Sequence, residues 1–252
     1  MSFLDLFSDA AAIYAASRPT YPAELFSFVA SIAPARDRAL DCATGNGQAA
    51  IGLAGHFREV VAVDASAEQI RQAMPRPNVS YRVASAEATG LPDASFDAIS
   101  AACGLHWFDR DRYYPEVKRL LRPRGVFAAW TYSRFTIDPA IDAFIRSSIQ
   151  DVVFPYWAQA NRLSWSGYRD VVFPFDEIAH PAFAIECDWT AEEMLGFLTT
   201  WSATRQCIRA IGSAFFESAS RELIQRWGPA GTTRRVTLPI DMRVGRVTPA
   251  QP

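Results

Sequence analysis

Two glycines and two acidic residues in the first third of the chain form a pattern that can hold a small ligand. The stretch "ALDCATGNGQAAIGLA", residues 39–54, runs from an apolar, strand-like lead through Gly45 and Gly47 into a helical pattern. Glycines at a strand-to-helix turn let the backbone approach a ligand because no Cβ is in the way. The series Gly45-x-Gly47-x-x-Ala50 also fits the dinucleotide-binding pattern G-x-G-x-x-G/A, which is weak evidence when it stands alone.

The two acids narrow the chemistry of that ligand. Asp41 precedes the turn, and Asp64 ends the next strand-like run, "VVAVD". This is roughly the 20-residue spacing of an acid that hydrogen-bonds ribose hydroxyls, although Asp64 can instead cap the helix that begins near Ser66. The Asp41 carboxylate would repel a diphosphate by about 1 kcal/mol at contact in water, and by more at a partly buried site. A cationic, phosphate-free nucleoside, S-adenosylmethionine, therefore suits the turn better than NAD.

His106 is the candidate for acid-base chemistry. It lies in "GLHWFD", residues 104–109, just after a predicted strand, which places it near the same sheet edge. Its imidazole can accept a proton from a hydroxyl or an amine. The alternative is a polar wall residue beside Trp107 and Phe108.

Composition excludes several classes of function. The 252 residues include 25 Lys and Arg against 27 Asp and Glu, with no basic stripe, which argues against nucleic acid as a partner. The chain has no basic N-terminal leader and no apolar run near the roughly 20 residues that a membrane span needs, so we expect a soluble, cytoplasmic protein. Its four cysteines are scattered, which predicts buried free thiols and neither a metal site nor a disulfide framework.

Strand-like and helical patterns alternate from residue 38 to residue 132. This alternation predicts an α/β fold with a mostly parallel sheet and helices on both faces. Two later runs complete a seven-stranded sheet, and in the last of them Val236, Leu238, Ile240, Met242 and Val244 share one face. Thr190 and Glu193 predict a capping box between these runs. The predicted strands are "RALDCA", "EVVAVDA", "VSYRVAS", "FDAISAA", "GVFAAWTY", "AFAIECDW" and "RRVTLPIDMRVGRV".

We expect one domain over residues 1–252, built from four segments. Aromatic residues are dense in a predicted helical insertion after the fifth strand. The segments are an N-terminal helical lid (1–37), a cofactor-binding core (38–132), the aromatic-rich insertion that caps the acceptor (133–181) and the completion of the sheet (182–252).

These motifs together resemble the class I, Rossmann-like methyltransferases that use S-adenosylmethionine to methylate small molecules. "LDCATGNGQ" is similar to the family's first motif, with Ala43 in place of its first glycine, and "VVAVDAS" is similar to the second. "VASAEATGLPDASFDAIS" resembles the third and fourth motifs, with Ser85 where the family often has Asp, and "RLLRPRGVFAAW" resembles the entry to the fifth strand. The resemblance covers about residues 39–130 in the family's order.

The resemblance implies which residues contact the cofactor. Asp64 would bind the ribose hydroxyls, and Ala86 and Glu87 would lie beside the adenine. Arg18 would give a charged hydrogen bond to the cofactor or to an acceptor carboxylate, unless it is a surface residue of a proline-rich turn. The full implied set is Arg18, Asp41, Ala43, Gly45, Gly47, Gln48, Asp64, Ala65, Ala86 and Glu87.

Three further stretches are similar to the group of trans-aconitate methyltransferase-like enzymes. They are "YAASRPTYP" at residues 14–22, "GLHWFD", and "TTWSATR" at residues 199–205. The similarity implies a small-molecule acceptor that contacts Tyr14, Tyr21, His106, Trp107 and Trp201.

The predicted reaction is in-line methyl transfer from S-adenosylmethionine to an oxygen, nitrogen or carbon of that acceptor, which includes a carboxylate. A carboxylate needs no base, whereas a phenol or amine needs a proton acceptor, for which His106 is the candidate. Two alternatives stay open, an NAD-dependent oxidoreductase and a non-catalytic module that binds S-adenosylmethionine. The acceptor's identity and the oligomeric state are also open.

Overall fold

The computed structural model describes residues 19–247, and the chain divides into two compact units. The predicted site residues Tyr14 and Arg18 lie outside the described residues. Of the described residues, the sheet unit contains Tyr21–Ser133, Arg162–Ala184 and 239–247, and the helical unit contains 19–20, Arg134–Asn161 and Ile185–Leu238. The segment 133–181, treated above as one insertion, is thus divided between the two units.

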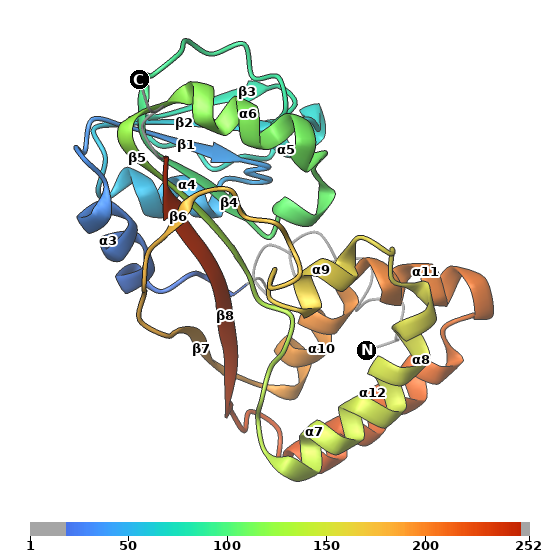
Figure 1. Cartoon of the computed structure of the whole chain (residues 1–252). Helices are drawn as coiled ribbons and strands as arrows, with labels where there is room; N and C mark the ends of the chain where they lie inside the picture. The colour runs from blue at the N-terminus through green and yellow to red at the C-terminus, as the bar shows by residue number, and fades with distance from the viewer. Residues whose placement is uncertain (1–18, 248–252) are drawn as a thin grey trace. The chain divides into compact units, whose positions relative to one another are not determined.

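Five parallel strands form the centre of the sheet unit, in the order β3-β2-β1-β4-β5 (Figure 1). Strand β8 (Arg234–Arg246) lies antiparallel to β5, with Met242 opposite Trp130, and β6 and β7 both pair with β8. All seven predicted strands are present, and the two-residue β6 (Asp176–Glu177) is the addition. The other bounds are β1 Arg38–Cys42, β2 Glu59–Asp64, β3 Val79–Val83, β4 Phe96–Ala102, β5 Leu121–Thr131 and β7 Phe183–Trp189.

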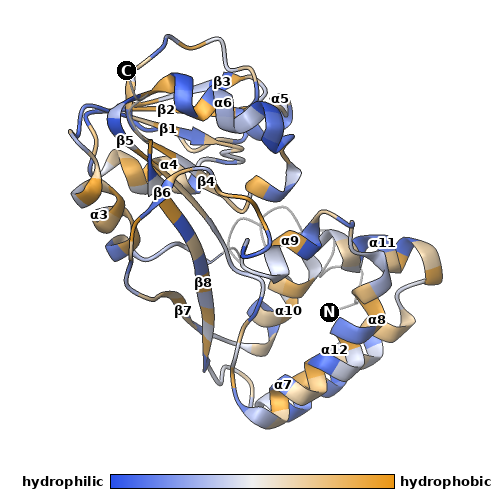
Figure 2. Cartoon of the chain, in the orientation of Figure 1, coloured by the Kyte–Doolittle hydropathy of each residue, from blue (hydrophilic) through white to orange (hydrophobic). Residues whose placement is uncertain are grey.

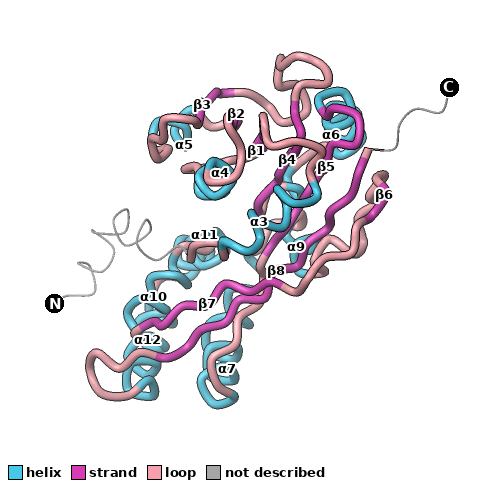
Figure 3. The backbone as a smooth tube through the Cα atoms, turned by 90° about the vertical axis from the view of Figure 1, so that its left-hand side faces the viewer, coloured by secondary structure: helices cyan, strands magenta, loops and turns pink. Residues whose placement is uncertain are grey.

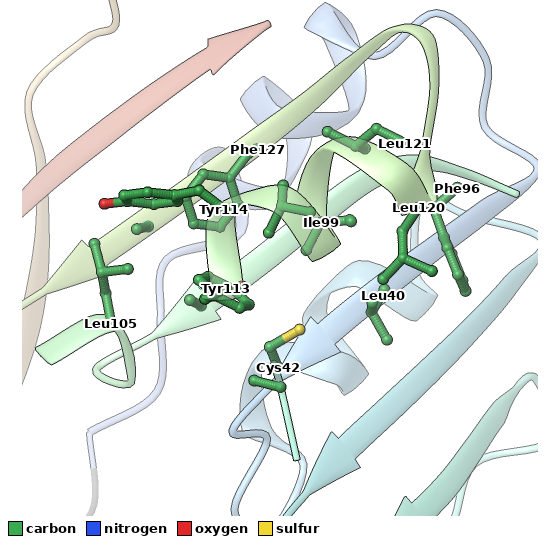
Figure 4. Packing of buried hydrophobic residues seen from close by; sticks show 14 of the residues in the cluster. Leu40, Cys42, Phe96, Ile99, Leu105, Tyr113, Tyr114, Leu120, Leu121 and Phe127 are labelled. Carbon is green, nitrogen blue, oxygen red and sulfur yellow. The ribbon is translucent and has the colours of Figure 1, made fainter. Parts of the chain in front are cut away.

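Helices cover both faces of this sheet, as predicted. On one face, Tyr113 and Tyr114 of α6 (Arg110–Leu120) pack with Leu40, Ile99 and Phe127 in one apolar cluster (Figure 4). On the other face, Trp130 contacts Phe26 of α3, and a Cβ added at Gly52 of α4 would lie 2.2 Å from the Phe26 ring. The remaining helical bounds in the core are α3 Ala23–Ile32, α4 Gln48–Ala54, α5 Ala67–Arg71 and the 3-10 helix η1 Leu105–Trp107.

The strands differ in burial according to their place in the sheet. Strands β1, β2 and β4 are almost wholly buried, as expected for parallel strands covered on both faces. Strand β3 ends the strand order and is largely exposed, with Val83 57% exposed. Along β8 the predicted alternation is confirmed, and Figure 2 shows hydrophobic and hydrophilic residues taking turns along this strand.

The helical unit contains the aromatic residues Phe135, Trp157, Phe197 and Trp201 in contact with one another. The capping box is confirmed, because Thr190 Oγ1 accepts from the Glu193 amide at 3.3 Å and Glu193 Oε2 accepts from the Thr190 amide at 2.8 Å. Figure 3 shows β8 as one continuous strand, which begins in this unit and ends in the sheet unit. The helical elements are α7 Pro139–Ile145, the π-helix η2 Arg146–Gln150, α8 Asp151–Val153, η3 Phe154–Tyr156, α10 Ala191–Thr199, α11 Ser202–Ile211 and α12 Ala214–Trp227, while α9 Asn161–Trp165 begins at the boundary between the units.

The sequence also predicts that the cysteines are buried free thiols and that no apolar run is long enough to span a membrane. All four cysteines are free, but only Cys42 and Cys207 are buried: Cys103 lies in the bend after β4, Cys187 lies on β7, and both are half-buried. Within residues 19–247, no helix is both long and apolar enough to cross a bilayer. Groups of three or more potential metal-ligating side chains are likewise absent from that range.

Candidate cofactor and acceptor site

The turn after β1 uses left-handed backbone at three positions. Ala43, Gly45 and Gly47 have φ angles of +54°, +56° and +93°. Apart from the adjacent residues of the turn, the only atom of residues 19–247 within 4 Å of a Cβ added at Gly45 is Gln69 Oε1, at 3.6 Å, so these residues leave space for a ligand there. Ala43 stands where the family motif has a glycine and adopts that conformation at a cost of about 1 kcal/mol.

Gly47 has a structural role in addition to the predicted contact with a ligand, which stays a prediction. An added Cβ would lie 2.3 Å from the Tyr81 hydroxyl and 3.0 Å from its ring carbons. The same hydroxyl donates to the Met74 carbonyl at 2.8 Å, and the Met74 amide donates to the Asn46 carbonyl at 3.1 Å. The missing side chain therefore makes room for Tyr81 of β3.

We predict that Gly47→Ala destabilises the protein by about 2 kcal/mol, the sum of a left-handed backbone penalty and modest overpacking against a rigid ring. Urea unfolding followed by circular dichroism measures the change. The matched control is Gly231→Ala, because the φ of Gly231, +80°, is similar and its added Cβ meets no atom of the described residues within 4 Å. Equal destabilisation in both variants would show that Tyr81 contributes nothing.

Asp41 lies beneath the turn and is fully buried. Its two carboxylate oxygens accept from the hydroxyls of Thr44 and Ser100, both at 2.6 Å. Burial raises the pKa of Asp41 from 3.8 to about 6, although the bonds from Ser100 and Thr44 lower it and the charge of Asp64 raises it further. The sequence places Asp41 just before the turn but does not show that its carboxylate is fully buried.

Asp64, the last residue of β2, connects the two loops that follow β1 and β2. One oxygen accepts from the Gly45 amide at 2.9 Å, and the other accepts from the Ser66 amide at 2.8 Å. Ser66, not Asp64, is the N-cap of α5, because its hydroxyl accepts from the Gln69 amide. Each Asp64 oxygen keeps a second lone pair, so the carboxylate can also accept from two ribose hydroxyls.

Ala86 and Glu87 have visible structural roles. Ala86 is buried in the apolar cluster beside α6. One Glu87 oxygen accepts from the Ser85 hydroxyl, and the other accepts from the amide of Asp109, the N-cap of α6, at 3.0 Å. Partial burial acts to raise the pKa of Glu87, but the bonds from Ser85 and backbone amides outweigh it and lower the pKa. Contact of these residues with an adenine stays a prediction.

His106 lies on η1, directly after the carboxyl end of β4. A Cβ added at the preceding Gly104 would lie 2.9 Å from the Ala43 Cβ, so this turn packs against the turn that follows β1. Burial lowers the pKa of His106 from 6.5 to about 4, which keeps the imidazole neutral at pH 7. Its Nδ1 lies 3.1 Å from the Tyr168 hydroxyl. Trp107 is 55% exposed, with its ring centroid 4.8 Å from that of His106.

The other predicted site residues divide between the two units. Tyr21 is half-buried in the sheet unit, with its ring 5.6 Å from Trp130 and its hydroxyl 3.6 Å from Cys103 Sγ. Gln48 is the half-buried first residue of α4, and Ala65 is exposed after β2. Trp201 belongs to the helical unit.

Four residues around these groups were not predicted as part of the site. Thr44 and Ser100 hold Asp41, Tyr81 fills the space above Gly47, and Tyr168 contacts His106. Thr44 is three residues from Asp41, so a local side-chain bond was foreseeable. The other three come from distant segments, and nothing in their local sequence marks them.

The charges near the turn fit S-adenosylmethionine better than a diphosphate. Residues 39–54 contain no Lys or Arg. Arg58 lies before β2, at the opposite end of that strand from Asp64, and is paired with Asp37. A cationic nucleoside would meet the charges of Asp41 and Asp64, whereas a diphosphate would meet two repelling carboxylates.

Comparisons with known proteins agree with this geometry. A family model described as a methyltransferase domain matches residues 40–129. A Dictyostelium discoideum protein assigned as a methyltransferase is 32% identical over 212 residues, 82% of this chain and 81% of that protein. The UbiE C-methyltransferase of Rubrivivax gelatinosus is 33% identical over 138 residues, 48% of this chain and 55% of that enzyme. A structure from Anaeromyxobacter dehalogenans, described as a type II methyltransferase, has a TM-score of 0.86 and 44% identity, and the match covers 92% of this chain and 99% of that one.

Proposed function

Because this chain belongs to the class I methyltransferases that use S-adenosylmethionine, we propose that it methylates a small molecule bearing a carboxylate. The burial of His106 beside Tyr168 supports this class of acceptor, because burial lowers the pKa of the imidazole. An imidazole whose pKa is about 4 is a poor proton acceptor at pH 7, because efficient general bases have pKa values near the working pH. A carboxylate is already a nucleophile and has no proton to lose.

The chain's own residues then have binding and positioning roles. S-adenosylmethionine supplies a methyl group that its sulfonium already activates. Asp64 binds the ribose hydroxyls, the open face of Gly45 lies against the cofactor, and the buried charge of Asp41 favours the positive charge of the donor. Alignment of acceptor and methyl group, with water excluded, can lower the barrier by several kcal/mol without any proton transfer.

On the acceptor side, the proposal assigns contacts to His106, Trp107 and Tyr21. Trp107 offers an exposed aromatic surface beside His106, and Tyr21 offers a phenol near Cys103. Tyr14, Arg18 and Trp201 are added from the resemblance to the trans-aconitate methyltransferase-like group. The cytoplasmic location, the absence of a nucleic-acid or membrane partner, and membership of that group are parts of the same proposal.

A panel of acceptors tests the proposal. The full-length protein is incubated with methyl-labelled S-adenosylmethionine and with carboxylic acids, phenols, amines and heteroaromatic compounds, trans-aconitate among the acids. We expect labelled methyl esters from one or more carboxylic acids, detected by mass spectrometry. The matched control is the Asp64→Ala variant, in which labelled product should fall strongly.

Two results would contradict the proposal. Transfer only to phenols or amines would show that the acceptor class is wrong. Binding of S-adenosylhomocysteine without turnover of any compound would favour the non-catalytic module.

A further inference from the structure

The Tyr168 hydroxyl lies 3.1 Å from Nδ1 of His106, although the two residues are 62 positions apart in the sequence. The predicted reaction does not require this contact. We propose that Tyr168 is a positioning residue that holds neutral His106 in the Nε2–H tautomer, so that His106 donates a hydrogen bond to the acceptor. This rests on the proposed function for its acceptor, and it assigns His106 a role opposite to that of a general base.

The backbone that carries Tyr168 is built to hold one conformation. Gly167 and Tyr168 both have a φ of +61°, and for tyrosine this left-handed conformation is strained. An added Cβ at Gly167 would lie 2.6–2.9 Å from side-chain atoms of Asp241 on β8, so the turn is packed tightly against that strand. Such strain persists only where surrounding contacts enforce it.

Arg243 of β8 supplies those contacts. Its Nη1 donates to the carbonyls of Tyr168 and Val171, at 2.9 and 3.1 Å. The same guanidinium lies over the Phe173 ring at 4.7 Å and pairs with Glu177. The Tyr168 amide also donates to the Leu163 carbonyl at 3.0 Å. Hydrogen bonds on both sides of Tyr168, to Leu163 and from Arg243, therefore fix the backbone that carries the phenol.

The direction of the bond between the two side chains follows from their chemistry. The Tyr168 side chain is fully buried, so its hydroxyl proton needs an acceptor inside the protein. The nearest imidazole nitrogen, Nδ1 of His106, is 3.1 Å away, and an unprotonated imidazole nitrogen accepts better than a phenol oxygen. The second nitrogen then carries the proton, since the bond made by one ring nitrogen sets the state of the other.

The pKa values of both groups are consistent with this direction. Burial holds the pKa of Tyr168 well above its usual range, so the phenol keeps its proton at neutral pH. Hydrogen bonds from Thr131 and from the backbone amides of Leu105 and His106 act in the opposite sense. A phenol that keeps its proton can donate it to Nδ1 of His106, 3.1 Å away.

The consequence concerns the acceptor. Nε2 of His106 has no hydrogen-bond partner among the residues that the structure describes. As an N–H donor, it can bind one oxygen of an acceptor carboxylate, while the other oxygen attacks the methyl group. The new O–CH3 bond forms as the S–CH3 bond breaks, and the products are an ester and S-adenosylhomocysteine, with no proton released.

Nitrogen NMR of the whole protein tests the tautomer directly. The chain has only three histidines, so protein labelled with 15N in its imidazole rings gives a simple spectrum. The variants His56→Gln and His180→Gln assign the other two rings. At pH 7.5 we expect His106 to show an unprotonated Nδ1 and a protonated Nε2, and Tyr168→Phe to convert this to a mixture of tautomers. A protonated Nδ1 with a bare Nε2 in the wild type, or an imidazolium, would overturn the proposal even if Tyr168→Phe does not fold.

Paired variants test the donor role with the carboxylic acid found in the acceptor panel. His106→Gln keeps an N–H donor, and we expect kcat/KM to fall about 10-fold or less; His106→Glu offers only acceptor atoms and should fall about 100-fold or more. The reverse order, with His106→Glu the more active, would show a general base. Calorimetry with S-adenosylhomocysteine on the wild type separates the two proposals, because failure to bind it refutes the proposed function while leaving the NMR result readable.

Discussion

Replacing Asp64 with alanine is expected to weaken S-adenosylhomocysteine binding about 100-fold or more. A charged acceptor typically contributes about 1.5–3 kcal/mol for each hydrogen bond, and two ribose hydroxyls can bond this carboxylate. The same substitution leaves the amides of Gly45 and Ser66 without their partner, which loosens the turn. Isothermal titration calorimetry on wild type and variant measures the ratio of dissociation constants.

The variant Glu222→Ala is the control for the change in net charge that Asp64→Ala causes. Glu222 pairs with Arg226 on α12 of the helical unit, with its side chain 49% exposed, and its removal changes the net charge by the same amount. We expect the affinity of this control to match the wild type. An Asp64→Ala variant that binds as tightly as the control would remove Asp64 from the cofactor site.

Asp41→Asn is expected to make the protein more stable at neutral pH and to weaken its binding of the methyl donor. The asparagine amide can still bond the hydroxyls of Thr44 and Ser100, while the buried charge is gone. Because the pKa of Asp41 is about 6 when folded and 3.8 otherwise, the folded state binds the proton more tightly. The contribution of this group to stability is therefore greatest at low pH and falls as pH rises from about 4 to about 6.

The variant's advantage in unfolding free energy should grow by about 2 kcal/mol between pH 4 and pH 8, as linkage requires. Urea unfolding of both proteins at several pH values measures it. Affinity for S-adenosylmethionine at pH 8 should fall about tenfold through loss of a nearby charge, and affinity for S-adenosylhomocysteine should fall less, because its sulfur is neutral. A difference in stability that does not vary with pH would show that Asp41 does not titrate as a buried acid.

The parts of the fold that were predictable from sequence are those that local patterns determine. Apolar runs such as "EVVAVD" must be buried strands, and the Thr190–Glu193 capping box needs only four residues to form. Strand β6 was missed because two residues form it only through pairing with β8. Strand β3 was expected in the sheet, and its exposure follows from its place at the end of the strand order.

Within the site, the types of residue were more predictable from the sequence than the burial and the neighbours of their side chains. The sequence shows Asp41 before a glycine turn, but its burial depends on Ser100, which the pairing of β1 with β4 brings beside it. The sequence shows Gly47 in the turn, but the Tyr81 ring that packs against it comes from β3. Burial lowers the pKa of His106, and its imidazole contacts Tyr168, which comes from a distant segment. Local spacing carries no information about such long-range neighbours.

The central claim is that two carboxylates, neither of them in an ion pair with a cation of residues 19–247, make this turn select a positively charged, phosphate-free nucleoside. Parallel calorimetric titrations of the wild-type protein with S-adenosylhomocysteine, whose amino group keeps its charge, and with NADH test it most directly. We predict saturable binding of S-adenosylhomocysteine and no measurable binding of NADH under the same conditions. Tight binding of NADH, with none of S-adenosylhomocysteine, would contradict the account.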